Sequence, residues 1–459
     1  MKIGLVGWGI ETKSAYHYFG KQHQYLIVSE QPIHEPPNGN NVQVQTLNIE
    51  RSSGDAGSVN DLSYMKNVEK CDLIIYTPIA WNNLVEYCST KLDVLKKSKT
   101  VLELFFEVVD RRKVIGVTGT KGKSTTATLL YEFLKKAGKK VYIGGNVGVS
   151  PLDFIEEMQS EDALAVIELS SYQLLNMKVS PHVAILLGIT PEHLDWHGSF
   201  DAYIEAKSHI TAFQNATDHL IYAQTNESAT KLASGSTAQK HPFPTEKSLV
   251  RLEQADLVFQ NGERLVWDEL HIKGAHNLLN LEAACIAYQL FVEDISPLID
   301  ALKEFKGLPH RLAFVAEHDG AKYYNDSIAS APEASLAGLR TFSPPVVLLI
   351  GGHDRGVDLY AFGQSLAGER SHLRHVICFG EVGVKLGEVM SSLDIPHTTV
   401  IDGGMKAVVE TASLHALPGD VVLLSPGFSS YDAYRKFHER GDDFCRAVTT
   451  LSTELEQYD

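Results

Sequence analysis

Residues Val114–Thr125, VIGVTGTKGKST, decide the fold of this 459-residue chain. Their first four residues form an apolar run that predicts a buried strand, and a glycine-rich turn follows it. The next residues have helical spacing, with apolar positions at Leu129, Leu130, Phe133 and Leu134, and we expect Gly138 to end that helix. A glycine-rich turn between a strand and a helix directs backbone N–H groups and the positive helix end at an anion. The stretch therefore predicts a phosphate-binding loop in an α/β sheet.

The residue types in this loop are those that bind a nucleotide. Lys123 can reach the β- and γ-phosphates, and the hydroxyl of Ser124 or Thr125 can ligate Mg²⁺. The strict Walker spacing is not met, because Val117 stands where its first glycine belongs. An incidental glycine-rich turn is the alternative, but GKST at a strand–helix junction is hard to obtain by chance. We expect the whole loop to contact the nucleotide: Gly119, Thr120, Lys121, Gly122, Lys123, Ser124 and Thr125.

Composition and charge narrow the classes of function. The chain is 44% apolar and has a formal net charge of −16, which argues against nucleic acid or an anionic membrane as the main partner. There is no run of about 18 apolar residues and no signal-peptide pattern, so a soluble, cytoplasmic protein is expected. The five cysteines are scattered without a CxxC pair, which supports neither a disulfide framework nor a zinc ribbon.

Short apolar runs alternate with amphipathic stretches along the whole chain, as in α/β domains with parallel sheets. The runs expected to be strands are Ile3–Val6, Leu73–Tyr76, Val114–Val117, Val141–Ile143, Leu164–Leu169, Val183–Ile189, Leu220–Tyr222, Val346–Ile350, His375–Phe379 and Val421–Leu424. Boundaries are expected near the charged stretch Asp110–Lys113 and near Lys306–Arg311, after a helix that starts at Ser296 and Pro297. Three domains result: residues 1–112, 113–306 and 307–459.

Two further strand ends carry candidate metal ligands. Glu168 ends an apolar run, and carboxyl ends of strands are where open α/β sheets bind ligands. Glu168 is therefore a candidate to share a metal with Ser124, although a strand-end glutamate is often only a solvated cap. His193 follows the next strand beside carboxylates and suits a second metal position, although a lone histidine is more often structural.

Lys207 falls inside the apolar stripe of a helix that Ser199 can cap. Such a lysine either extends its amine to solvent or is held for chemistry. Desolvation lowers the pKa of a lysine, and a neutral amine can react with CO₂ to give a carbamate, a metal-binding anion. From spacing alone, the solvent-reaching alternative is the better interpretation.

Taken together, these residues resemble the Mur ligase family over about residues 113–459. The motifs occur in the order of that family: GTKGKST, GGNVG (Gly144–Gly148), ELSSYQL (Glu168–Leu174), TPEHLDWHGSFDAYIEAK (Thr190–Lys207), GAHNLLN (Gly274–Asn280), GLPHR (Gly307–Arg311), YYNDS (Tyr323–Ser327) and LLSPGFSSYD (Leu423–Asp432). ELSSYQL and the terminal YDAYRKFHERGDDF are most similar to the D-glutamate-adding branch of the family.

The resemblance implies three α/β domains: a Rossmann-like UDP-binding domain, a central P-loop ATPase-like domain with a parallel sheet, and a Rossmann-like C-terminal domain that closes over the nucleotide. It implies peptidoglycan-precursor chemistry, in which UDP-N-acetylmuramoyl-L-alanine takes the γ-phosphoryl of ATP. An amine of an acidic amino acid, D-glutamate in this branch, then displaces phosphate from the acyl phosphate. Such ligases are usually monomers.

The resemblance also implies roles for individual residues. Lys123 would stabilise the transferring phosphoryl. Two Mg²⁺ ions would be held by Ser124, Glu168, His193 and a carbamylated Lys207. For Lys207 this reverses the interpretation from spacing alone, in which the amine reaches solvent. The nucleotide would be bound further by Asn277, Asn280, His310, Arg311 and Asp326. The two substrates would be bound by Gly9, Ile10, Asn146, Ser170, Ser330, Arg355, Ser430 and Phe437.

The chain departs from the family pattern in two places. In the N-terminal domain, Thr12 replaces the third glycine of GxGxxG, and Glu11 stands where the family has a small or hydroxyl residue near the diphosphate. The SPG turn of the branch is here Thr77-Pro78-Ile79. In the amino-acid pocket the DSKATN of the branch reads DSIASA, and Arg355 replaces a lysine, so D-glutamate and L-glutamate both stay open.

Other functions compete with this assignment. A sibling ligase with another amino acid or acceptor, such as a folylpolyglutamate synthase, is the first, although folate enzymes usually lack ELSSYQL. A phosphate-loop ATPase that acts as a switch or motor is the second, but it should show a Walker-B aspartate where this chain has Glu168. A relative coupled to a glutamine amidotransferase would be expected to carry clustered zinc cysteines.

Overall fold

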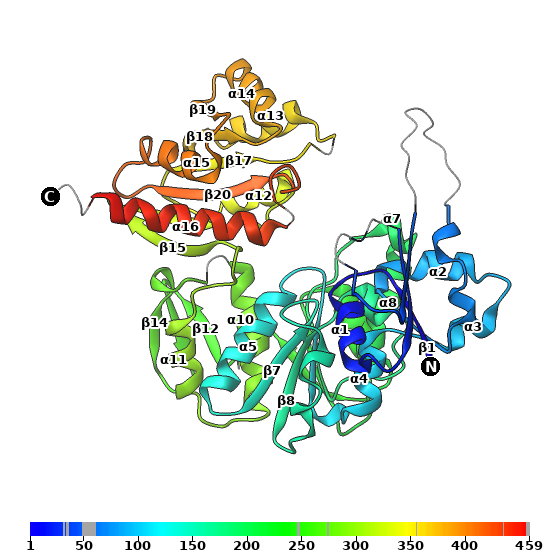
Figure 1. Ribbon diagram of the computed structural model, residues 1–459. Helices are drawn as coiled ribbons and strands as arrows, with labels where there is room; N and C mark the ends of the chain where they lie inside the picture. Colours follow the sequence, from blue (N-terminus) through cyan, green and yellow to red (C-terminus); the bar gives the residue numbers. More distant parts are fainter. Residues whose placement is uncertain are drawn as a thin grey trace. The chain divides into compact units, whose positions relative to one another are not determined.

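The computed structural model describes residues 1–30, 33, 36–47, 61–245, 248–272, 275–354, 356–434 and 436–455. The chain forms two compact units, one made of residues 1–264 and 275–303 and the other of residues 265–274 and 304–459. Both contain parallel sheets with helices between the strands, which confirms the predicted α/β class (Figure 1). The division into three domains at residues 112 and 306 stays a prediction. None of the described helices has both the length and the apolar character needed to cross a bilayer.

The first sheet of the first unit has the strand order β3-β2-β1-β4-β5 and is parallel throughout. This order is that of a doubly wound, Rossmann-like sheet. Its strands are β1 Lys2–Val6, β2 Gln24–Ser29, β3 Val42–Thr46, β4 Leu73–Tyr76 and β5 Ser98–Lys99. Its helices are α1 Ile10–Phe19, α2 Trp81–Tyr87, α3 Leu92–Lys96 and α4 Val101–Val108.

The second sheet of this unit has the order β11-β10-β9-β6-β8-β7, again all parallel. Its strands are β6 Val114–Thr118, β7 Lys140–Gly145, β8 Ala163–Glu168, β9 Val183–Leu186, β10 His219–Ala223 and β11 Gln239–Phe243. The helices are α5 Lys123–Lys136, α6 Ser171–Leu174, α7 Leu194–His197, α8 Phe200–Ala212, α9 Glu227–Gly235, α10 Ala275–Gln289 and α11 Ser296–Glu304. A three-stranded sheet follows β11, with β12 Val250–Glu253, β13 Asp256–Phe259 and β14 Arg264–Val266.

Strand β6 lies between β8 and β9, so the carboxyl ends of these three strands meet at one sheet edge. The apolar positions predicted after the phosphate loop are all buried on α5, which packs beside α10 (Figure 1). Helix α8 packs on β6 and β9 and begins at Ser199, whose hydroxyl accepts from the N–H of Ala202 as expected of a cap. Three helices therefore hold the edge where the phosphate loop begins.

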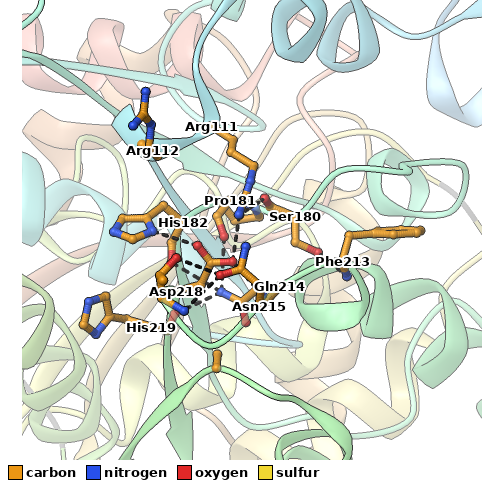
Figure 2. A network of polar contacts seen from close by, with 12 residues as sticks. Arg111, Arg112, Ser180, Pro181, His182, Phe213, Gln214, Asn215, Asp218 and His219 are labelled. Carbon is orange, nitrogen blue, oxygen red and sulfur yellow. Dashed lines mark hydrogen bonds and ion pairs between the residues drawn. The ribbon is translucent and has the colours of Figure 1, made fainter.

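The opposite, amino-terminal edge is held by a polar network around Asp218 (Figure 2). The Asp218 carboxylate is fully buried and accepts from Arg111 Nη1 at 2.8 Å and from the Asn215 N–H at 2.7 Å, while His182 Nδ1 lies 2.8 Å from it. Burial alone would raise its pKa, but the bonds from Arg111, Asn215 and His182 outweigh it, and the pKa is lowered. Gln214 adds side-chain bonds to the carbonyls of Pro181 and His219.

The second unit is a sheet of order β15-β16-β20-β17-β18-β19, antiparallel only at β15. Its strands are β15 Ala313–His318, β16 Ala321–Asn325, β17 Val346–Gly351, β18 Leu373–Phe379, β19 His397–Val400 and β20 Val421–Gly427. Its helices are α12 Pro332–Leu339, α13 Leu359–Gly368, α14 Gly383–Ser392, α15 Gly404–Ser413 and α16 Phe437–Leu455. Alternate residues of β17 enter different cores: Val346 and Leu348 pack with α12–α14, and Val347 and Leu349 with α15 and α16.

Candidate active site

The phosphate loop joins β6 to α5 through backbone that glycine alone adopts without strain. Gly119 has φ +154° and Gly122, the N-cap of α5, has φ +86°. A Cβ on Gly122 would lie 2.1 Å from Asn280 Oδ1, and one on Gly119 would lie 2.6 Å from Leu187 Cβ. The close approach also places Asn280 beside the loop, and Asn280 Nδ2 donates to Asn277 Oδ1 at 2.9 Å. The predicted phosphate loop and asparagine pair therefore lie together.

Thr120 and Lys123 tie the loop to its surroundings. Thr120 Oγ1 donates to the carbonyl of Thr190, accepts from the N–H of the same residue at 2.9 Å, and lies 3.1 Å from the Tyr203 hydroxyl. Lys123 Nζ donates to the loop carbonyls of Gly119 and Thr120, at 3.2 and 2.9 Å. The shape of the loop is thus fixed by its own side chains.

The remaining loop residues lie at the start of α5 or on the surface. Ser124 and Thr125 occupy the first turn of the helix, Ser124 partly buried and Thr125 buried. The Lys121 side chain is 80% exposed and pairs with Glu192 at 2.9 Å, which places it outside the loop's interior.

Glu168 has the geometry expected of a carboxylate that ligates a cation. Its side chain is 1% exposed at the end of β8, and its Oε1 accepts from Asn146 Nδ2 at 2.8 Å. Its Oε2 is buried and has no hydrogen-bond partner among the described residues. Leaving a buried carboxylate oxygen unsatisfied is costly, and a hard cation with oxygen ligands would remove the cost. The residues therefore fit a Mg²⁺ ion at this position.

Lys207 does not reach solvent. Its side chain is 1% exposed on α8, and Nζ donates to Gly119 O at 2.8 Å and to Thr118 Oγ1 at 3.2 Å. Burial, and then the charge of Lys123, lower the pKa of Lys207 far below its usual value, although the charge of Glu168 opposes them. The neutral amine that a carbamate requires is therefore favoured here.

His193 is exposed and sits in the left-handed region with φ +56° as the N-cap of α7. Protein atoms around the imidazole ring reduce its hydration and lower its pKa, and the charge of Lys123 lowers it further, while the charge of Glu192 opposes them. A lowered pKa favours the neutral imidazole, which is the form that can bind a metal. Among the described residues no group of three His, Cys, Asp or Glu side chains could hold a metal. The predicted set of Ser124, Glu168, His193 and a carbamylated Lys207 contains only two side chains of these types, and it stays a prediction.

Glu11, the acidic residue near the predicted diphosphate site, has a hydrogen-bond partner in the structure. Glu11, in the first turn of α1, accepts a hydrogen bond from Gln173 Nε2 at 2.8 Å and thus bonds to α6. Burial raises the pKa of Glu11, although the hydrogen bond from Gln173 opposes this. Ser170 caps α6 and bonds to the same Gln173. Gly9 is the N-cap of α1, and the side chain after it, Ile10, is 58% exposed.

In the second unit the structure brings His310, Arg311 and Asp326 together. The Asp326 carboxylate accepts from the N–H of Leu312 and from Ser425, and the N–H of Ile328 donates to His310 O. Burial raises the pKa of Asp326 to about 7, although the hydrogen bonds from Ser425 and Leu312 and then the charge of Arg311 oppose this.

The predicted amino-acid pocket is only partly described. Ser430 is buried after β20, Phe437 begins α16, and Ser330 is exposed after β16. Phe437 O accepts from Ser327 Oγ, which joins α16 to the β16 loop. Arg355 lies outside the described residues, so its predicted role stays a prediction.

The sequence did not single out Arg440 or Gln173. Arg440 is 1% exposed beneath the loops after β16 and β20, and Gln173 is the partner of Glu11. Arg440 is one arginine in the charged stretch YDAYRKFHERGDDF, and no residue near it in the sequence indicates that its side chain is buried. Gln173 lay within ELSSYQL, but its partner stands 162 residues away.

The chain is similar to known proteins in sequence and in fold. The family description "Mur ligase middle domain" matches residues 117–288. UDP-N-acetylmuramoylalanine–D-glutamate ligases from Clostridium botulinum (strain Langeland) and Clostridium kluyveri are 30% and 31% identical over 461 and 463 positions. Each alignment covers 98% of this chain and 97% of the relative.

Solved structures share the fold at lower identity. The UDP-N-acetylmuramate–alanine ligase MurC from Thermotoga maritima has a TM-score of 0.58 at 19% identity and covers 98% of this chain and 100% of its own. The MurF ligase of Thermotoga maritima, determined in complex with ADP, has a TM-score of 0.55 at 17% identity. The match covers 98% of this chain and 95% of the MurF chain.

Proposed function

Since the chain belongs to the Mur ligase family and is an ATP-dependent ligase of peptidoglycan-precursor synthesis, we propose that it adds D-glutamate to UDP-N-acetylmuramoyl-L-alanine. The observation that carries the ligase chemistry is the single sheet edge that joins a phosphate loop, a Glu168 oxygen without a partner and a buried, deprotonation-prone Lys207. The full-length match to D-glutamate ligases supports the choice of substrates.

In the first step, the carboxylate of the L-alanyl group attacks the γ-phosphorus of ATP, and ADP leaves. We assign Lys123 and the N–H groups of the loop to the transferring phosphoryl, and Asn277 and Asn280, beside Gly122, to nucleotide binding. Thr120 keeps the loop in place through Thr190 and Tyr203, so little reorganisation is needed when phosphate binds. Asn146 orients the Glu168 carboxylate.

Two Mg²⁺ ions, when bound, would neutralise the phosphate charge. We propose Ser124, Glu168, His193 and Lys207 as their protein ligands, with Lys207 converted by CO₂ to a carbamate. That reaction forms a bond between Nζ and the CO₂ carbon and releases one proton. It needs a neutral amine, which burial of Lys207 favours.

In the second step, the amine of glutamate attacks the acyl phosphate, and inorganic phosphate leaves the tetrahedral intermediate. We assign Ser330, Arg355, Ser430 and Phe437 to the incoming amino acid, and His310, Arg311 and Asp326 to nucleotide binding. We assign the UDP group to the α1 loop at Gly9 and Ile10, where the Glu11 carboxylate accepts a hydrogen bond from Gln173. We assign Ser170 to the acceptor substrate. The protein is proposed to act as a cytoplasmic monomer.

The test is phosphate release by the purified protein with Mg-ATP, UDP-N-acetylmuramoyl-L-alanine and D-glutamate, with each component omitted in turn. Release should require all three, and Glu168→Gln should abolish it. Glu205→Gln, an exposed change on α8, is the control and should leave release unchanged. Release that continues without the nucleotide sugar would contradict the proposed acceptor.

A further inference from the structure

Arg440, near the start of α16, is a fully buried cation without a role in the chemistry above. Its side chain is 1% exposed. Nε donates to Ser327 Oγ at 3.0 Å, Nη2 to Ser327 O at 2.9 Å and Nη1 to Phe428 O at 3.0 Å. These three bonds use three of the five guanidinium N–H groups.

The guanidinium lies at the carboxyl edge of the second unit's sheet. Ser327 follows β16, Phe428 follows β20, and Gly352 follows β17, whose strands are parallel neighbours. A Cβ on Gly352 would lie 3.0 Å from Arg440 Nη1, so the guanidinium also touches this third loop. The carboxyl edge of an open α/β sheet is where ligands bind.

The guanidinium of Arg440 has no hydrogen-bonded acidic partner within the described part of the chain. Arg440 forms no ion pair there, and all three of its acceptors are neutral. Burial lowers the pKa of Arg440 to about 10, and Asp432 opposes this by its charge, so the side chain stays protonated at neutral pH. Arg374 in the same unit, by contrast, has its charge balanced by a carboxylate. Its guanidinium donates two hydrogen bonds of 2.8 and 3.0 Å to buried Asp420. A buried charge without such a partner favours an external anion.

A second buried group at this edge also lacks a partner. Ser429 is 4% exposed, and its Oγ has no hydrogen bond among the described residues. Its carbonyl accepts from the N–H of His353, so the residue itself is held in place by the β17 loop. An unused hydroxyl next to the residue that binds a buried cation is a donor available to an anion.

We propose that Arg440 is a positioning and specificity-determining residue for the incoming amino acid: it holds three strand-end loops in register and supplies the positive charge that, with Ser429, selects a carboxylate. This proposal rests on the proposed function and adds the reason that an acidic amino acid is preferred. A carboxylate at this edge gives the guanidinium the acidic hydrogen-bond partner that it lacks within the described part of the chain.

The test compares two nucleophiles on one acyl phosphate. Hydroxylamine has no carboxylate and attacks the acyl carbon to give a hydroxamate and phosphate. Arg440→Gln should raise the KM for D-glutamate about tenfold or more, the scale of a lost charge-assisted bond. Hydroxamate formation should change by less than about twofold, because the charge acts on the carboxylate alone. Arg440→Lys should recover most of the affinity, and Arg446→Gln, an exposed change on the same helix, should alter neither rate.

Equal losses of glutamate addition and hydroxamate formation in Arg440→Gln would show a purely structural role and overturn the proposal. If that variant does not fold, Ser429→Ala decides the question, because it removes a hydroxyl that has no bond to lose. It should raise the KM for D-glutamate several-fold, and an unchanged KM would count against the site. Calorimetric binding of glutarate separates this proposal from the proposed function. If the enzyme does not use D-glutamate but binds glutarate in a way that depends on Arg440, the carboxylate site is supported and the proposed function is contradicted.

Discussion

Replacing Lys207 by methionine tests whether the buried amine is neutral in the folded protein. Methionine keeps an unbranched chain of similar length in a site that is 1% exposed. It removes the bonds to Gly119 O and Thr118 Oγ1 together with the titrating group. The fold should persist, because a buried amine is replaced by an apolar side chain, while ligase activity should be lost.

The magnitude follows from proton linkage. The pKa of Lys207 in the folded protein lies well below its usual value, which the unfolded chain retains. Between the two pKa values the unfolded chain binds one proton more, so stability rises with pH and reaches its full value only above the unfolded pKa. The wild type should therefore gain about 1.4 kcal/mol per pH unit over Lys207→Met, starting from the folded pKa.

Hydrogen exchange of peptides from β6 and α8 measures this difference within the first unit alone. The wild type minus variant difference in opening free energy should grow as the pH rises toward about pH 10. Dissolved bicarbonate should stabilise only the wild type, because only it can form the carbamate. Equal pH slopes in both proteins would refute the assignment of a neutral, buried amine.

Three more changes test the site and its frame. Gly122→Ala should weaken ADP binding measured by calorimetry at least about tenfold, because φ is +86° and the Cβ would meet Asn280 at 2.1 Å; unchanged affinity would contradict the loop geometry. Asp218→Asn should lower the unfolding free energy by about 3 kcal/mol, since it leaves the Arg111 charge without its partner; chemical unfolding measures this, and a loss below about 0.5 kcal/mol would contradict it. Lys123→Ala should abolish ATP turnover with normal thermal unfolding, and undiminished phosphate release would contradict the phosphate-loop assignment.

Much of the fold followed from apolar periodicity. All ten apolar runs predicted as strands contain strands, because a parallel strand buried on both faces is apolar along its whole length. Two predictions were too long: Leu164–Leu169 ends as a strand at Glu168, and Val183–Ile189 ends at Leu186. After β9 the chain turns, and the Gly188 carbonyl accepts from the N–H of Thr120. The small sheet β12–β14 and strands β2, β3, β5, β11, β15, β16 and β19 were not predicted. Most of them are short or partly exposed, but β2 is buried over Tyr25–Ser29 and was missed although its sequence is apolar.

The site was only partly predictable, because burial and distant partners are not local properties. Lys207 has the spacing of a lysine that reaches solvent, yet the contacts to Gly119 and Thr118 enclose it. The sequence predicted that the Glu11 carboxylate faces a diphosphate, yet the carboxylate accepts a hydrogen bond from Gln173 on α6. Only the fold reveals which groups meet, whereas the phosphate loop was predictable because its chemistry lies in consecutive residues.

The proposed reaction joins one D-glutamate to UDP-N-acetylmuramoyl-L-alanine at the expense of one ATP. The most direct measurement is the mass of the product formed in parallel from D-glutamate and from L-glutamate, with ADP and phosphate counted in the same reactions. Product is expected only with D-glutamate, together with one ADP and one phosphate for each molecule formed. Product with L-glutamate alone, or ADP formed without any condensed product, would contradict the proposed reaction.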